Sequence, residues 1–224
     1  MSKVDMQMIN QVMEATGETL VMVFFSTVFS LLLGLPIGVL LHITGKEEDG
    51  GIIPSPVFNS VLSRIVNVLR SFPFIILLIV LIPLSRIIVG SSIGTKAAIV
   101  PLSIAAAPFV ARIIESALKE VDPGVIQAAK AMGSTNWQLV YKVLIPEAMP
   151  ALMSGLTLTI INLIGYSAMA GTIGGGGLGD LAIRYGYQRF RPSYLVAAVI
   201  VILIMVEIIQ VAGDRIVKRM MSRR

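Results

Sequence analysis

The chain has 224 residues, of which 55% are hydrophobic and only 14% are charged, and its net charge is +5. This composition is too apolar for a soluble globular domain and indicates an all-α polytopic membrane protein. Because there is no cysteine and only one histidine, a disulfide framework, a thiolate metal site and a histidine-rich hydrolase site are excluded. We expect no catalytic residue and no bound metal.

Five segments are long and apolar enough to cross a hydrocarbon core, which takes about 20 residues of helix. They are residues 20–41, 65–82, a stretch within 87–111, 151–171 and 194–211. The first segment is too long for a signal-peptide core and no small-residue cleavage site follows it, so we expect it to be retained. Pro36 predicts a kink in the first segment without ending the span, and Pro101 and Pro108 predict bends in the third.

The distribution of lysine and arginine predicts an orientation. Five spans place the two termini on opposite sides, and cytoplasmic flanks are rich in lysine and arginine. The bias favours an N-terminus outside and a cytoplasmic C-terminus, where Arg215, Lys218, Arg219, Arg223 and Arg224 follow the last span. This cluster is typical of a membrane flank rather than of a nucleic-acid surface. We treat 1–224 as a single transmembrane domain that contains one long cytoplasmic segment, residues 112–150.

The cytoplasmic segment predicts two short helices. Asp122 can cap a helix that starts at Pro123, and Gly133 can close it in the left-handed conformation. A shallow apolar face is predicted on this helix: Val125, Ala128, Ala129 and Met132. Ser134 or Thr135 can cap a second helix, which Pro146 would end. Two interpretations remain open: the helices dock in another protein's groove, or they lie on the membrane or on their own bundle.

A glycine run follows the fourth span, at Gly174, Gly175, Gly176, Gly177 and Gly179. Its spacing formally satisfies the dinucleotide-binding fingerprint, but a membrane helix precedes it and position 199 is a valine instead of an acidic residue. The chain also has no Gly-Lys-Ser/Thr, so we expect no phosphate-cradling loop and no cofactor on this chain. A flexible outer turn and a close-packed element of an outer mouth are both compatible with glycine.

The cytoplasmic segment resembles the coupling motif of ABC importer permeases, which has a Glu-Ala-Ala, a glycine and an Ile-x-Leu-Pro at fixed spacing. The matching positions here are Gln127, Ala128, Ala129, Met132 within the same helix, Gly133, Val143, Ile145 and Pro146. Gln127 replaces the acid, Val143 the isoleucine and Ile145 the leucine. The resemblance implies that this segment docks into a cleft on a cytoplasmic ATPase subunit.

A narrower resemblance extends over nearly the whole chain. Residues 70–78, 82–90, 165–171, 185–187 and 212–217 are similar to the permeases of methionine ABC importers. This implies the type I ABC importer fold with five transmembrane helices, in the inner (plasma) membrane of a bacterium. It also implies a homodimer with the path between protomers, two ABC ATPase subunits, a substrate-binding lipoprotein outside, and uptake of methionine in its L- and D-forms or of close derivatives.

Two alternatives stay open for the function. A permease for another amino acid would carry the same motif, because external binding proteins often set specificity. An ion-coupled secondary transporter is less favoured, because such folds usually carry inverted repeats and we find no convincing repeat.

Polar and small residues within the spans give further candidates. By resemblance and by their place before the glycine run, Tyr166, Ser167, Met169 and Gly171 are candidates for lining the path, with ordinary helix packing as the alternative. Asn67 and Asn162 are expected to form interhelical hydrogen bonds. We expect Glu207 to pair with a nearby cation and Arg70 to extend toward the interface.

Overall fold

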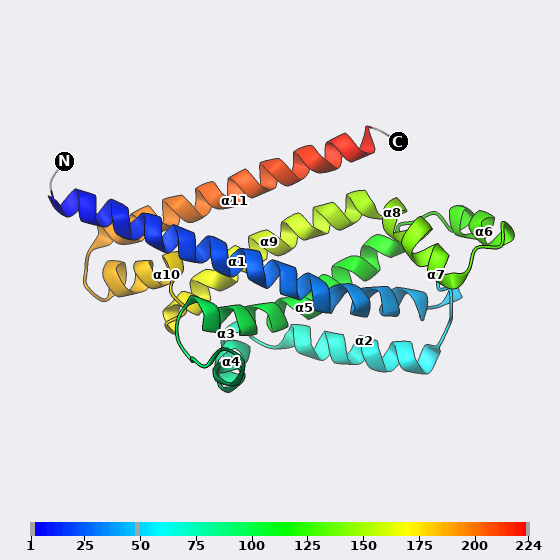
Figure 1. Ribbon diagram of the computed structural model, residues 1–224, viewed down its shortest axis with the longest axis horizontal. Helices are drawn as coiled ribbons and strands as arrows, with labels where there is room; N and C mark the ends of the chain where they lie inside the picture. The colour runs from blue at the N-terminus through cyan, green and yellow to red at the C-terminus, as the bar shows by residue number, and fades with distance from the viewer. Residues whose placement is uncertain (1–2, 48–49, 223–224) are drawn as a thin grey trace. The chain divides into compact units, whose positions relative to one another are not determined.

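The computed structural model describes residues 3–47 and 50–222, and every regular element in that part of the chain is helical (Figure 1). Arg223 and Arg224 of the basic cluster lie outside the described residues. The elements, in chain order, are α1 (Lys3–Ile43), α2 (Pro56–Ser71), α3 (Phe74–Val80), α4 (Ile82–Val89), α5 (Thr95–Lys119), α6 (Pro123–Ala131), α7 (Asn136–Gln138), the π-helix η2 (Leu139–Leu144), α8 (Ile145–Glu147), α9 (Met149–Thr172), α10 (Gly177–Leu181), the π-helix η3 (Ala182–Tyr187) and α11 (Pro192–Met221).

The described residues form two compact units. Unit 1 is drawn from residues 3–29, 72–106 and 159–211, and unit 2 from residues 30–47, 50–71, 107–158 and 212–222. The glycine run and the candidate path residues belong to unit 1. The segment 112–150 and α2 belong to unit 2.

Four of the described helices are long and apolar enough to cross a membrane: α1, α5, α9 and α11. A fifth span results if α2 and α3 are counted together as one bent span. The expectation of an all-helical polytopic protein is therefore confirmed.

Two predicted spans differ in detail from the structure. The segment 65–82 is not one helix, because the chain breaks between Ser71 and Phe74 at Pro73. Proline has no amide hydrogen and disfavours helical backbone in the residue before it, which accounts for the break. The third span begins only at Thr95, because Gly90 closes α4 in the left-handed conformation.

In unit 2, α1 approaches α5 closely through two glycines one turn apart. A side-chain carbon added at Gly38 would lie 2.6 Å from the carbonyl oxygen of Ala111 and 2.7 Å from Cβ of Ile114. Gly34 is equally tight against Ala107 and Val110 on α5. Small residues at this spacing let helix backbones pack against one another in lipid. The first span thus uses its glycines for contact, while Pro36 is accommodated inside a continuous helix.

Gly38→Ala should lower the free energy of unfolding by about 1–3 kcal/mol, because the new methyl group overpacks a backbone contact. The check is unfolding of the purified protein in detergent. The matched control is Gly17→Ala on the same helix, where nothing lies within 4 Å of the added carbon. Equal stability of the two variants would contradict the close contact between α1 and α5.

Candidate functional site

Helix α6 is built as the sequence predicts. Asp122 Oδ1 accepts a hydrogen bond of 2.7 Å from the amide of Gly124, and Pro123 is the first helical residue. At the other end Gly133 has φ +81°. The amides of Gly133 and Ser134 donate to the carbonyls of Lys130 and Ala129, at 2.9 and 3.1 Å. This pair of bonds is the Schellman arrangement, so both ends of α6 are fixed by local hydrogen bonds.

The two sides of α6 have different surroundings. Ile126 and Ala129 are 4% exposed, and Ile126 packs in the core of unit 2. Val125, Ala128 and Met132 are exposed, Met132 to 80%. Ala129 therefore does not belong to the predicted apolar face, because its side of the helix is held against its own unit. The exposed side of α6 consists of Val125, Ala128 and Met132, with Gln127 beside it.

The second helix starts as predicted but does not end at Pro146. Thr135 forms a capping box with Gln138, whose side-chain Oε1 accepts from the amide of Thr135 at 2.9 Å. The helix then passes through the π-helical turns of η2 and continues into α8, which has Pro146 in its first turn. Because proline cannot donate to the carbonyl four residues earlier, the wider π turn shifts the hydrogen-bond register ahead of it: Ile145 donates to Val140. Val143 and Ile145 are half-buried.

Aromatic side chains extend the exposed apolar surface of this segment. Trp137 is 73% exposed and Tyr141 is 43% exposed, with ring centroids 5.9 Å apart. The ammonium of Lys142 lies 5.7 Å from the centre of the Tyr141 ring. On the opposite side, Leu139 and Leu144 are fully buried. The segment is thus anchored to unit 2 on one side and exposes an apolar surface on the other.

In unit 1, the glycine run is a close-packed element. Gly177 and Gly179 are buried, and Gly174, Gly176 and Gly177 have positive φ angles of 89°, 80° and 76°. The amide of Gly177 donates to Glu18 Oε2 at 2.6 Å, and the amide of Leu178 donates to Thr19 Oγ1 at 2.9 Å. Two α1 side chains therefore cap the first turn of α10, and the run is not a free turn in this structure.

Glu18→Ala should free the amide of Gly177 and destabilise α10 by about 1.5–3 kcal/mol, the contribution of a hydrogen bond to a charged group. Hydrogen exchange at Gly177 and Leu178 measures this directly, and faster exchange is expected. Glu14→Ala, at an exposed position one turn earlier, is the control and should leave both amides protected. Unchanged protection in Glu18→Ala would contradict the capping role.

The four candidate path residues differ in burial and in contacts. Ser167 is 1% exposed and its hydroxyl donates to Ile164 within α9, and Gly171 is buried against Gly179 and Asp180. Tyr166 is half-buried and stacks on Phe74 with ring centroids 4.1 Å apart. Only Met169 is exposed, at 47%.

Sequence reasoning did not assign to the path the residues that share the exposed surface with Met169. Asn162, Gly165 and Thr172 are exposed on α9 at helical spacing from it. Together these four residues form the α9 stripe. Small and polar residues recurring every three or four positions in an apolar helix are the signal that identifies such a stripe.

The expectations for four polar residues of the predicted spans have mixed outcomes. Asn67 Oδ1 accepts a hydrogen bond from Arg112 of α5, as expected. Asn162 is exposed and bonds to no other helix among the described residues, because its position on the stripe points it away from its own unit. Glu207 is also exposed and forms no ion pair within the described ranges. Arg70 is exposed in the last turn of α2.

Residues 34–222 match a family whose model is described as "Binding-protein-dependent transport system inner membrane component". This chain belongs to that family. It is a multi-pass component of the inner membrane, as the sequence predicts.

Two curated relatives are similar over most of their length. The chain is 48% identical to the "Probable D-methionine transport system permease protein MetI" of Vibrio cholerae, over 93% of this chain and 92% of the relative. It is 49% identical to the "Methionine import system permease protein MetP" of Bacillus subtilis, over 79% and 78% of the two chains.

A solved structure described as "Inward facing conformations of the MetNI methionine ABC transporter" matches with TM-score 0.91 and 47% identity, over 98% of this chain and 99% of that chain. The expected resemblance and permease fold are both confirmed.

Proposed function

We propose that this chain is the permease subunit of an ATP-driven ABC importer that takes up methionine. The observation that carries the proposal is the identity of nearly half to methionine permeases along almost the entire chain. The capped α6 with its exposed apolar side supports the same function, because it is a suitable contact for a separate ATPase. The substrate is methionine in its L- and D-forms or a close derivative.

The working assembly contains two copies of this chain, two cytoplasmic ABC ATPase subunits that bind ATP and magnesium, and a substrate-binding lipoprotein outside the membrane. The family description names dependence on a binding protein, and the sequence has no phosphate-binding loop of its own. The N-terminus lies outside and the C-terminus in the cytoplasm, in agreement with the lysine and arginine bias. Residues 1–224 act as one transmembrane domain, with 112–150 as its coupling segment.

In the coupling segment, the exposed side of α6 docks into the ATPase. Val125, Ala128 and Met132 offer a shallow apolar contact, and Gln127 takes the position of the acid in the related motif. Gly133, Val143, Ile145 and Pro146 shape the turn and the helix that hold α6 in place. A docked partner would also explain why Trp137, a large aromatic side chain, is 73% exposed.

The translocation path lies along the α9 stripe, with Met169 as its most prominent side chain. A helix that faced lipid here would expose Asn162 and Thr172 to hydrocarbon, which is unfavourable. A water-filled path or a second copy of the chain accepts polar groups.

The glycine run and α10 form the gate at the outer mouth, where Gly174, Gly175, Gly176, Gly177 and Gly179 permit close backbone approach.

Transport proceeds by alternating access. ATP binding on the partner subunits brings the two coupling helices together and opens the outer mouth to the binding protein, and hydrolysis resets the inward state. The permease itself needs no catalytic residue, only contacts that differ between the two states.

The complex of this chain with its ATPase and binding protein, reconstituted in vesicles, tests the proposed function. We expect uptake of labelled methionine that depends on ATP and on the binding protein. Uptake of another amino acid in preference to methionine would show that methionine is not the substrate. Uptake driven by an ion gradient without ATP would instead identify a secondary transporter.

Gly133→Val should reduce methionine uptake about tenfold while leaving the protein in the membrane. A β-branched residue resists φ +81°, so the end of α6 reorients and the contact with the ATPase is lost. Uptake and ATP hydrolysis are measured together in vesicles. Gly133→Asn is the control, because asparagine tolerates left-handed backbone and open space surrounds this position. Normal uptake by the valine variant would count against the coupling role of α6.

A further inference from the structure

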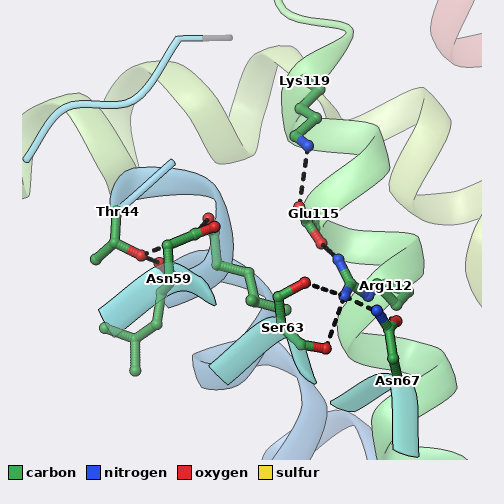
Figure 2. Close-up of polar contacts among 9 residues, drawn as sticks. Thr44, Asn59, Ser63, Asn67, Arg112, Glu115 and Lys119 are labelled. Carbon is green, nitrogen blue, oxygen red and sulfur yellow. Dashed lines mark hydrogen bonds and ion pairs between the residues drawn. The ribbon is translucent and has the colours of Figure 1, made fainter. Parts of the chain in front are cut away.

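Two polar stripes face each other in unit 2 (Figure 2). On α2, Asn59, Ser63 and Asn67 recur every four residues and share one side of the helix. On α5, Arg112, Glu115 and Lys119 follow at intervals of three and four. Neither stripe belongs to the family's coupling motif or to the α9 stripe.

A single guanidinium connects the two stripes. Arg112 Nη2 donates to the Ser63 carbonyl at 3.0 Å, to the Ser63 hydroxyl, and to Asn67 Oδ1 at 2.9 Å. Its Nη1 donates to Glu115 Oε2 at 2.6 Å. The planar guanidinium fork therefore fixes both the distance and the register of α2 along α5, which a lysine ammonium could not do.

Glu115 holds this guanidinium in place. The Glu115 side chain is 9% exposed and lies between two cations, with Lys119 Nζ 3.0 Å from its second oxygen. A carboxylate with so little contact with water is sensitive to the loss of either partner. The three charges therefore form one continuous row of ion pairs along α5.

The other end of α2 is fastened to α1. Asn59 Nδ2 donates to the carbonyl of Leu41 at 2.6 Å and to Thr44 Oγ1 at 3.1 Å (Figure 2). Helix α2 is amphipathic, and Val66 is its buried residue. Polar bonds therefore hold α2 both to α1 and to α5.

The charged row on α5 lies at the start of the coupling segment, directly ahead of α6. Lys119 is the last residue of α5, and Asp122 caps α6 only three positions later. Leu118, Val121 and Ile126 pack in one apolar core, so a displacement of α6 moves the last turns of α5. Those turns carry Arg112.

One donor of Arg112 is unused in this conformation. Its Nε is buried and has no acceptor among the described residues. All of the bonds from Arg112 to α2 therefore come from Nη2.

We propose that Arg112, oriented by Glu115, is the positioning residue that makes α2 move with α5 when the ATPase displaces α6. The proposal rests on the proposed function and adds the route by which force passes from the coupling segment to α2, which lies outside that segment. Arg112 contacts neither substrate nor nucleotide in this role.

Arg112→Lys in the complete reconstituted complex tests the route. Lysine keeps the charge and the pair with Glu115 but loses the fork to Ser63 and Asn67. We expect methionine transported per ATP hydrolysed to fall about tenfold, within the range for residues that couple distant sites, while the ATPase subunits still co-purify. Arg64→Lys, the same change at an exposed position next to Ser63, should leave the ratio unchanged.

Two further variants separate positioning from folding. Ser63→Ala with Asn67→Ala leaves the charges on α5 intact and should also lower the ratio. Asn67→Asp combined with Arg112→Lys restores a charged bond between the helices and should return the ratio to within about threefold of wild type. A merely structural loss would lower uptake and hydrolysis in proportion and would not be rescued.

The proposal is overturned if Arg112→Lys matches Arg64→Lys, if uptake and hydrolysis fall in proportion, or if the aspartate variant rescues nothing. Failure of the proposed function is distinct, because the wild-type complex itself would then show no ATP-driven methionine uptake.

Discussion

Backbone amides and carbonyls have no water to bond with in a hydrocarbon core, so each must find a partner within the protein. Long helices meet this requirement for most of the chain. Where the backbone of unit 1 leaves a long helix, side chains satisfy this requirement instead, as Glu18 and Thr19 do when they cap α10. In the segment outside the spans, Asp122 and Gly133 close α6 with local bonds as well. The irregular elements are therefore held by specific bonds. This lets a short helix transmit a displacement instead of absorbing it.

The segment that is proposed to couple to the ATPase has two sides of opposite character. Ile126 is buried in the core of unit 2, whereas Met132 is 80% exposed. A partner bound to the exposed side would act on the core of unit 2 through the buried side. From there, Arg112 offers the polar connection between α5 and α2. In the proposed mechanism, the docked side of α6, the apolar core of unit 2 and the charged row on α5 thus form one continuous route.

The sequence predicts what depends on local chemistry and misses what depends on neighbours. The caps of α6 follow from residue types at fixed spacing, and the long apolar helices follow from hydropathy. Hydropathy averages over Pro73 and so hides the break between α2 and α3. An alanine is compatible with either side of a helix, so the burial of Ala129 could not be read from the pattern. Ser167 is buried by tertiary packing, and Arg112 meets α2 across 45 and 49 positions of sequence.

Cross-linking from two adjacent alanines of α6 tests the central claim most directly. A cysteine at position 128 or 129 would be the only one in the chain and can carry a short photoreactive group. Ala128 is exposed and Ala129 is buried in its own unit. The account predicts that Ala128→Cys cross-links to the ATPase subunit in native membranes and that Ala129→Cys does not. Cross-links from position 128 only to lipid or to the chain itself would contradict it.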